Sequence, residues 1–442
     1  MVELTVALLA GLIVAMGIVG LSREATNTFH DEARASAAEA TLRAAIDRLR
    51  IDLQRAGYMS TGNIQSDPNI SAPLGQQPAA MVKNLQGIHL VRGGNASLGL
   101  STTANGLTPD LIEIGGNLSS SDQFDVAAMP QAAAGQRLNS GCVKISLSPR
   151  SPAMYRLLAS GGGSSSATAA TELQNTFQPD PAKLFLIRLV DDSGRSQFLA
   201  TCLGTSGFAT GIDATGWPYV MVDATSTPIQ TAQTTGTVGA LDGYAAGRAW
   251  VNPVQVVRWE ITSASSATDP EPAQFALASE TMDGGADPNK YDLVRTVLDQ
   301  SGNPTAVSEV VAEYAVDLKF GFDVDTSGPW AAGTQPVPNL LSYAFEDENN
   351  GAVATTVSNV PRPYPQRIRS VRVRLATRAA QPDRTGPIGV APSYGDTYTY
   401  RYCVLPSSGG ACPNPPDNVE RWARVRTLTT EVALPNQAKN FY

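Results

Sequence analysis

The segment from Leu4 to Leu21 reads LTVALLAGLIVAMGIVGL, eighteen residues without a charged side chain. As a helix it would be about 27 Å long, close to the thickness of the hydrocarbon core of a bilayer. A secretory signal peptide opens with positive charge, keeps a shorter apolar region and ends in a small-residue cleavage site. The only charged side chain before this run is acidic, that of Glu3. The segment therefore predicts that residues 1–21 form one membrane-spanning helix.

Glu3 stands at the membrane end of that helix. A carboxylate in or near a bilayer is costly unless a partner pairs with it. Arg23 is about 30 Å farther along the helix and cannot be that partner. Two interpretations stay open: a Glu3 that pairs with a group outside this helix, and a Glu3 that rests at the membrane interface.

The helical pattern continues beyond the membrane segment. No Gly or Pro occurs from Ser22 to Ala56, and Gly57 supplies a stop signal. Charged residues cover most of the circumference, and Arg48 and Asp52 are spaced to pair across one turn. One apolar stripe remains, at spacing i, i+4, i+7 and i+11: Leu42, Ile46, Leu49 and Leu53. We expect residues 22–57 to extend the helix to about 55 residues and to lay this stripe on a globular head.

The composition indicates a turn-rich β protein for residues 58–442. Charged residues make up 16% of the chain, and there are 39 Gly and 30 Pro among 442 residues. The net charge of −8 gives no attraction to nucleic acid, so we expect no nucleic-acid partner.

Short apolar runs separated by turn residues predict antiparallel strands after Gly57. A hairpin is expected at 184–190 and 197–203, and further strands at 254–261, 291–298, 310–322 and 370–375. Three segments poor in large apolar residues are expected to be exposed loops: 160–171, 225–239 and 263–272. We expect one elaborated head with a possible inserted lobe near residues 120–250, rather than two independent domains.

Catalytic and metal-binding constellations are scarce. There are two histidines, His30 on the long helix and His89 in an expected strand. The chain therefore has too few histidines for a multi-histidine metal site, and few candidates for the histidine of a catalytic triad. We expect no catalytic residues, no cofactor and no enzymatic activity. Asp323 and Asp325 precede Gly328 like part of a calcium loop, but the distal Glu is missing and a turn at a strand end is the simpler interpretation.

The four cysteines form an even set that suits an oxidising compartment. Cys403 and Cys412 bracket a short loop and are the favoured disulfide pair. Cys142 and Cys202 form a second possible disulfide or remain free buried thiols, because pairing cannot be read from sequence. A group of arginines indicates either a basic strip or a solvated strand face: Arg362, Arg367, Arg369, Arg372 and Arg374.

Two helical stretches resemble the type IV prepilin-like proteins, and within them the large minor pilins of the PilW family. Residues 2–8 read VELTVAL, similar to the family's LVELMVAL, and residues 46–58 read IDRLRIDLQRAGY, similar to its DLRQAGY helix end. Weaker matches follow in the expected strands, PVQVVRW at 253–259, DLVR at 292–295, AVDLKF at 315–320 and IRSVRV at 368–373, and in the ending TLTTEVALPN at 427–436. The resemblance covers most of the chain except the loops.

The resemblance implies an α+β fold in which a long N-terminal pilin-type helix packs on an elaborated antiparallel β-sheet head. It also implies a subunit that waits in the bacterial inner membrane, with one membrane pass and the head in the periplasm, before it joins an extracellular pilus. In the family a peptidase trims a leader, the new N-terminus is methylated, and the nearby acid pairs with the amine of a neighbouring subunit. Glu3 matches that acid.

One departure from the family concerns the start of the chain. The family's acid is the fifth residue of the mature protein, whereas Glu3 is the third residue here and no leader precedes it. We expect that the start is clipped or misassigned.

Three functions follow as hypotheses. The first is a minor pilin that primes pilus assembly or lies at the tip, and supports adhesion and motility; its partners would be other minor pilins, the major pilin and a large tip adhesin. The second is a minor pseudopilin of a type II secretion system. The third is a membrane-tethered periplasmic binding domain that never polymerises.

Overall fold

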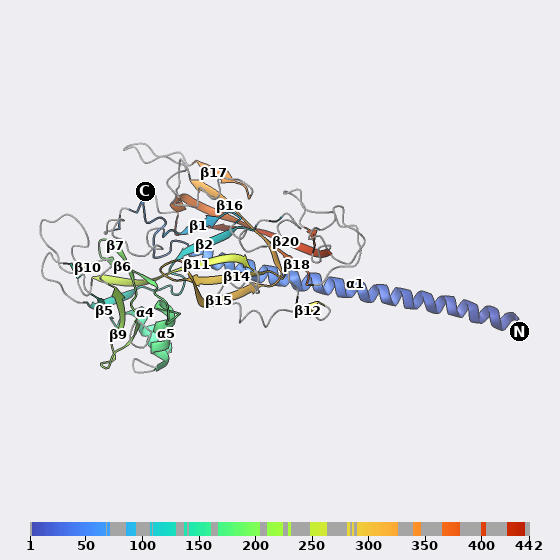
Figure 1. Cartoon of the computed structure of the whole chain (residues 1–442), viewed down its shortest axis with the longest axis horizontal. Helices are drawn as coiled ribbons and strands as arrows, with labels where there is room; N and C mark the ends of the chain where they lie inside the picture. Colours follow the sequence, from blue (N-terminus) through green and yellow to red (C-terminus); the bar gives the residue numbers. More distant parts are fainter. Residues whose placement is uncertain are drawn as a thin grey trace.

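The computed structural model describes residues 2–67, 69–70, 85–93, 107, 109–129, 137–138, 141–160, 167–203, 210–223, 229–230, 248–262, 281–282, 285–286, 290–325, 339–345, 365–380, 399–403 and 422–437. Helix α1 (Val2–Gln54) is continuous over 53 residues, about 80 Å at 1.5 Å per residue. Its N-terminal half projects from a β-rich head and its C-terminal end lies against that head (Figure 1). Gly57 follows the helix with φ +70°, which confirms the predicted stop.

The head is built mainly from strands, together with two short helices, α4 (Pro152–Ser160) and α5 (Ala167–Phe177), and a 3₁₀ turn, η3 (Pro365–Arg367). Its strands are β1 (Ile88–Val91), β2 (Leu111–Gly116), β3 (Phe124–Ala128), β4 (Arg137–Leu138), β5 (Cys142–Leu147), β6 (Leu186–Asp191), β7 (Ser196–Ala200), β8 (Thr210–Ile212), β9 (Pro218–Asp223), β10 (Ile229–Gln230), β11 (Ala249–Thr262), β12 (Thr281–Met282), β13 (Gly285–Ala286), β14 (Asp292–Leu298), β15 (Pro304–Ala312), β16 (Ala315–Asp325), β17 (Leu340–Tyr343), β18 (Ile368–Arg378), β19 (Thr399–Cys403) and β20 (Trp422–Ala433).

The described strands form two large antiparallel sheets. One has eleven strands and is organised around β11, and the other has five strands in the order β17-β16-β18-β20-β19. The C-terminal half of β11 pairs with β2 and β14, whereas its N-terminal half pairs with β3 and β6. The expected class, α+β with antiparallel sheets and an N-terminal helix, is therefore confirmed at this level.

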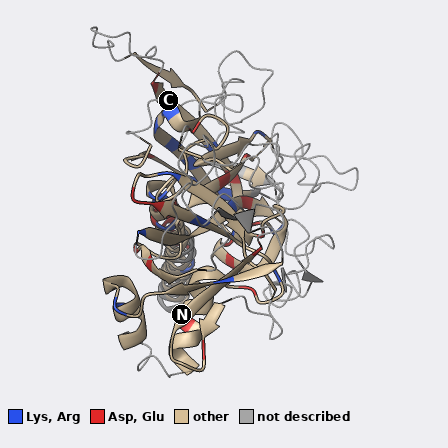
Figure 2. Cartoon of the chain, turned by 90° about the vertical axis from the view of Figure 1, so that its left-hand side faces the viewer, with Lys and Arg blue, Asp and Glu red and all other residues tan. Residues whose placement is uncertain are grey.

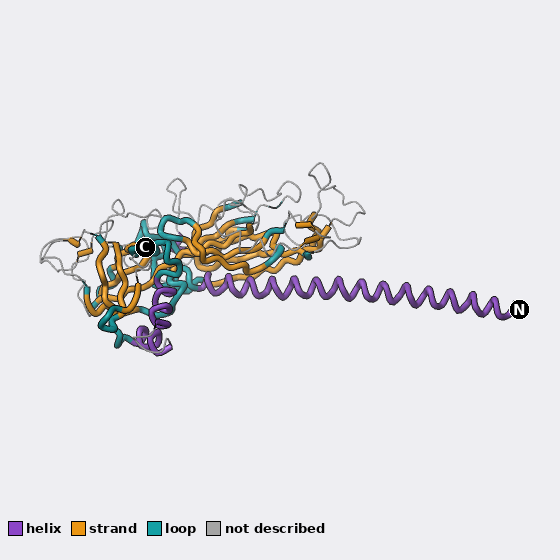
Figure 3. Tube along the Cα trace, turned by 60° about the horizontal axis from the view of Figure 1, so that its bottom comes forward, coloured by secondary structure: helices purple, strands orange, loops and turns teal. Residues whose placement is uncertain are grey.

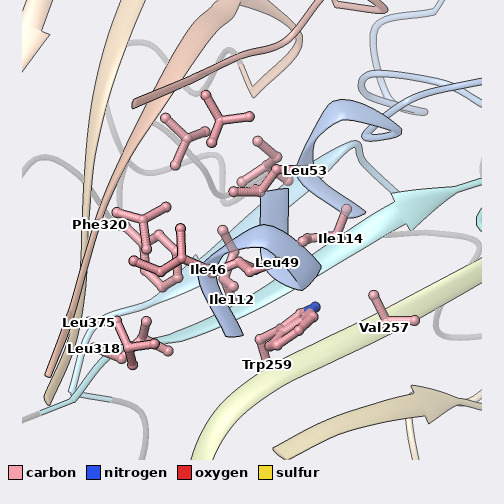
Figure 4. Packing of buried hydrophobic residues seen from close by; sticks show 14 of the residues in the cluster. Ile46, Leu49, Leu53, Ile112, Ile114, Val257, Trp259, Leu318, Phe320 and Leu375 are labelled. Atoms are coloured by element: carbon pink, nitrogen blue, oxygen red, sulfur yellow. The ribbon is translucent and has the colours of Figure 1, made fainter. Parts of the chain in front are cut away.

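One hydrophobic core joins the helix to both sheets. It contains the buried face of α1, Ile112, Ile114, Val257 and Trp259 of the eleven-stranded sheet, and Leu318, Phe320 and Leu375 of the five-stranded sheet. In Figure 4 the end of α1 lies between these strands, with side chains from both sides directed toward it. The helix thus completes a core that neither sheet covers alone.

A second core lies in the inserted lobe, which we define as residues 124–251. Its buried apolar residues run from Phe124 to Val251 in the sequence and come from β3, β5, β6, β7, β9, β11 and the helices α4 and α5. The two helices lie on one side of the lobe (Figure 3). The lobe shares β11 with the rest of the head, so the two cores are joined by one continuous strand.

Most predicted strands occur where expected. β6 and β7 form the predicted hairpin, and β11, β14 and β18 cover the runs at 254–261, 291–298 and 370–375. In β18 the alternation is also confirmed: Val371, Val373 and Leu375 are buried, while Arg372 and Arg374 are only partly so.

Two predictions about segments are wrong. The run at 310–322 is two strands, β15 and β16, because the chain turns at Tyr314 (φ 54°) and passes from one sheet to the other. The backbone N–H of Tyr314 donates to Asp292, a contact that local sequence cannot reveal. The end of the predicted loop at 160–171 belongs to α5, because Ala169, Leu173 and Phe177 are buried on one helical face. Of the other expected loops, residues 225–228, 231–239 and 263–272 lie outside the described residues, whereas Ile229 and Gln230 form the short strand β10, which pairs with β4.

Charges are mixed over the head. Seen end-on in Figure 2, basic and acidic residues are intermingled along the described strands. This distribution agrees with a chain whose charges are used mainly in local ion pairs.

Candidate functional site

The N-terminal part of α1 is an exposed apolar surface. Large apolar side chains from Leu8 to Leu21 are between 59% and 73% exposed. The stretch Leu8–Thr26 is long and apolar enough to cross a membrane, and none of it is buried in the molecule. Glu3 lies in the first turn of α1, but its side chain is outside the described part of the structure. The helix therefore offers one candidate membrane span with no covering from its own head.

The C-terminal part of α1 is seated in the head by the stripe that the sequence singles out. Leu42, Ile46, Leu49 and Leu53 are at most 5% exposed and belong to the core shared with both sheets. Burial of each leucine or isoleucine side chain stabilises the packing of α1 on the head by about 1.5–3 kcal/mol. Ile51, on another face of the helix, is 48% exposed, so burial follows the helical period.

A buried carboxylate, that of Asp52, adds a polar anchor that sequence reasoning missed. Its Oδ2 accepts hydrogen bonds from Nε of Arg295 (2.7 Å) and from Nε1 of Trp259 (3.1 Å). Asp52 is 1% exposed. The predicted partner, Arg48, is 3.9 Å from the other oxygen and also approaches Glu309. Asp52 therefore belongs to the interior and not to a solvated face of the helix.

The end of α1 is joined to the head through backbone contacts. The N–H of Gly57 donates to the carbonyl of Gly115 (2.8 Å), and that of Asn117 donates to the carbonyl of Tyr58 (2.8 Å). A Cβ on Gly116 would lie 2.5 Å from the carbonyl oxygen of Arg55, so only glycine allows this approach. These bonds fix where the helix stops relative to β2.

The C-terminal segment of the chain also reaches the helix end. Nδ2 of Asn436 donates to the carbonyl of Gln54 (2.7 Å), which is one of the carbonyls without an intrahelical partner. Asn436 is the last residue of the segment 427–436, which resembles the end of the PilW-family sequences. The C-terminal end of α1 and the last described residues of the chain thus meet at this point.

The structure contains one disulfide among the described residues, Cys142–Cys202, with a Cα–Cα distance of 6.0 Å. The sequence left open whether Cys142 and Cys202 form a disulfide or remain free thiols, and the structure has the disulfide. Cys412 of the favoured pair lies outside the described residues, so the Cys403–Cys412 bond stays a prediction.

The two carboxylates considered as weak metal ligands are paired with arginines. Asp323 and Asp325 lie in β16 and not in a turn, and Asp325 pairs with Arg369 (3.2 Å) while Asp323 approaches Arg372 (3.7 Å). Arg374 pairs likewise with Asp317. The arginines of β18 therefore form neither a basic strip nor a freely solvated face, because they neutralise the acids of β16. Arg362 lies outside the described residues.

Asp317 belongs to a buried group of four charges. Lys319 pairs with Asp110 (3.3 Å) and Arg374 with Asp317 (3.3 Å), and Oδ1 of Asp317 has no hydrogen-bond partner. Burial raises the pKa of Asp317 to about 6, and Asp110 adds to the rise, although Arg374 and Lys319 oppose it. The folded state therefore holds a proton on Asp317 at a pH where the unfolded chain does not.

This raised pKa predicts a pH dependence of stability. Because the pKa is higher in the folded than in the unfolded state, the contribution of Asp317 is largest at low pH and is lost as the pH rises through about 6. Between pH 7.5 and 5 the wild type is expected to gain about 1 kcal/mol relative to Asp317→Asn, which cannot titrate. Denaturant midpoints of both proteins across this range measure the difference; a constant difference would contradict the assignment.

His89 is part of an ion-pair chain on the eleven-stranded sheet. Its Nδ1 is 2.8 Å from Glu113, which also accepts from Arg258 (2.9 Å) across the next strand. Burial acts to raise the pKa of Glu113, but the hydrogen bonds and charges of His89 and Arg258 outweigh it and hold that pKa below its usual value. The arrangement links β1, β2 and β11.

The chemistry of the site is packing, anchoring and ion pairing. In the part of the chain that the structure describes, no group of three or more His, Cys, Asp or Glu side chains could hold a metal ion. Comparisons of the chain with protein-family models, with curated proteins and with solved structures find no match.

Proposed function

We propose that this chain is a minor subunit of a bacterial type IV filament. It would be held in the inner membrane by the first third of α1, with its head in the periplasm, until it joins an extracellular pilus. The observation that carries the proposal is the division of α1: its first part is apolar and uncovered, and its last part is the core element of a β-rich head. An apolar helix that its own head leaves bare suits transfer from lipid to a helical bundle of neighbouring subunits.

The size of the head supports a rare position in the filament. The sheet-dominated body is larger than a simple pilin head, because the inserted lobe adds a second core. A bulky head is difficult to repeat along a thin fibre, so priming of assembly or a place at the tip fits better than the shaft. The expected partners are other minor pilins, the major pilin and a tip adhesin.

Replacement of Glu3 by alanine tests the proposal. If Glu3 pairs with the amine of a neighbouring subunit, removal of more than about 1.4 kcal/mol of pairing energy would lower incorporation roughly tenfold or more. The measurement is the amount of this subunit in sheared surface filaments, with the membrane fraction blotted to show that the variant is still made.

Glu39→Ala is the matched control. Glu39 is an exposed acid on the same helix and pairs with Arg43 (2.6 Å). An exposed pair of this kind contributes little, so the control is expected to assemble as the wild type does. Unchanged incorporation and motility of Glu3→Ala would favour a tethered domain that does not polymerise. Co-purification with a secretion apparatus instead of pilus subunits would favour the pseudopilin alternative.

A further inference from the structure

The sheet of the inserted lobe has one sealed face and one open face. Side chains such as Val143, Val220 and Val251 enter the core beneath α4 and α5. Successive residues of a strand point to opposite faces, so the residues between these core positions point away from that core. We call this second surface the open face; its members are all partly exposed: Asp125, Lys144, Ser146, Tyr219, Met221 and Trp250.

Trp217 stands at the rim of the open face in a tightly held turn between β8 and β9. Its side chain is 41% exposed. Its backbone N–H donates to Oδ1 of Asp213 (2.9 Å), its carbonyl accepts from the N–H of Asp213 (2.9 Å), and Thr215 donates to the same Oδ1. Gly216 supplies the left-handed residue of the turn (φ 83°). An indole that is exposed while its backbone is fixed offers contact area at low entropic cost.

Polar side chains lie at the turn that holds Trp217. Nζ of Lys144 lies 4.9 Å from the centre of the Tyr219 ring and 2.6 Å from Oδ2 of Asp213. The Tyr219 ring lies against Gly211, where a Cβ would be 3.2 Å from its hydroxyl oxygen. The hydrogen bond from Lys144, with those from Thr215 and Trp217, holds the pKa of Asp213 well below its usual range. The charges of Lys144 and Asp213 therefore cancel locally, and the lysine keeps further N–H donors.

We propose that the open face binds a neutral oligosaccharide. The indole of Trp217 would stack on the C–H face of a sugar ring, and the Lys144 ammonium and the Tyr219 hydroxyl would bond to sugar hydroxyls. An exposed, firmly held indole with hydrogen-bonding groups and paired charges near its turn suits a ligand that is amphipathic and uncharged.

The position of the lobe agrees with this role. The lobe lies at the end of the molecule opposite the N-terminus of α1 (Figure 1), so its ligand is not the membrane that holds the helix. The inference goes beyond the proposed function and does not depend on it, because the lobe has its own core.

The test is a titration of the purified full chain in detergent with cellohexaose, maltohexaose and chitohexaose, and with the acidic hexamer of galacturonic acid. We expect saturable heat of binding with at least one neutral hexasaccharide and weaker binding of the acidic one. Trp217→Ala is expected to weaken the binding roughly tenfold, as is typical when a central aromatic contact is removed.

Tyr155→Ala is the matched control, because Tyr155 is an exposed aromatic residue of the same lobe (68%) that belongs to α4, on the sealed side of the sheet. The control should bind as the wild type does, and both variants should keep the wild-type melting temperature. Absence of saturable binding by every neutral hexasaccharide, or equal binding by Trp217→Ala, would overturn the proposal. Preference for the acidic hexamer would also overturn it.

Discussion

Asp52→Ala is expected to lower the free energy of unfolding of the head by about 3–5 kcal/mol, because it leaves the buried charge of Arg295 without its partner. The Arg295 side chain is 10% exposed and its Nε donates to Asp52 at 2.7 Å. The variant also deprives Nε1 of Trp259 of its acceptor in a fully buried position. Denaturant unfolding of the full chain in detergent micelles, followed by tryptophan fluorescence, measures the loss.

The control for this prediction is Asp47→Ala. Asp47 is an acid of the same helix with an exposed side chain, and its replacement is expected to change stability by less than about 0.5 kcal/mol. Similar losses in both variants would show that helix propensity, and not the buried anchor, determines the effect.

A double-mutant cycle then separates pairing from packing. Arg295→Ala removes the other side of the ion pair, and the double variant leaves neither charge unpaired. We expect the double variant to lose less than the sum of the single losses, with a coupling of about 0.5–3 kcal/mol. Additive losses would mean that Asp52 and Arg295 stabilise the packing of α1 on the head independently of each other.

Sequence reasoning could find the packing of α1 but not its polar anchor. The stripe from Leu42 to Leu53 is visible because it repeats with the helical period inside one local segment. Asp52 follows the same helix, but its partners Trp259 and Arg295 lie 207 and 243 residues away. The one local signal was its place at the edge of the stripe, three residues after Leu49.

The strands show the same limit. Alternation in β18 predicted which face is buried, since that property is local. The division of 310–322 into β15 and β16 was not predictable, because no Gly or Pro marks the turn at Tyr314, which depends on Asp292 of another strand. The pairing of Asp323 and Asp325 with arginines of β18 likewise depends on register between strands that are distant in sequence.

The second large effect concerns the disulfide of the lobe. Its sequence separation of 60 residues corresponds to a stabilisation of about 4 kcal/mol in the chain-entropy description. The bond also bridges the two sides of β9. On one side Cys142 of β5 pairs with Asp223 of β9, and on the other side the N–H of Cys202 donates to the carbonyl of Met221 in β9. Cys142→Ser/Cys202→Ser is therefore expected to destabilise the lobe by up to about 4 kcal/mol.

Hydrogen exchange locates this loss and tests whether the lobe can open separately. Amides of β5 and β9 should lose protection in the double variant, whereas those of β16 and β18 should keep it, because the two pairs of strands belong to different hydrophobic cores. Reductant applied to the wild type should reproduce the change. Any remaining effect of reductant on the double variant would report on Cys403 and Cys412, and unchanged protection of β5 and β9 would contradict a structural role for the Cys142–Cys202 bond.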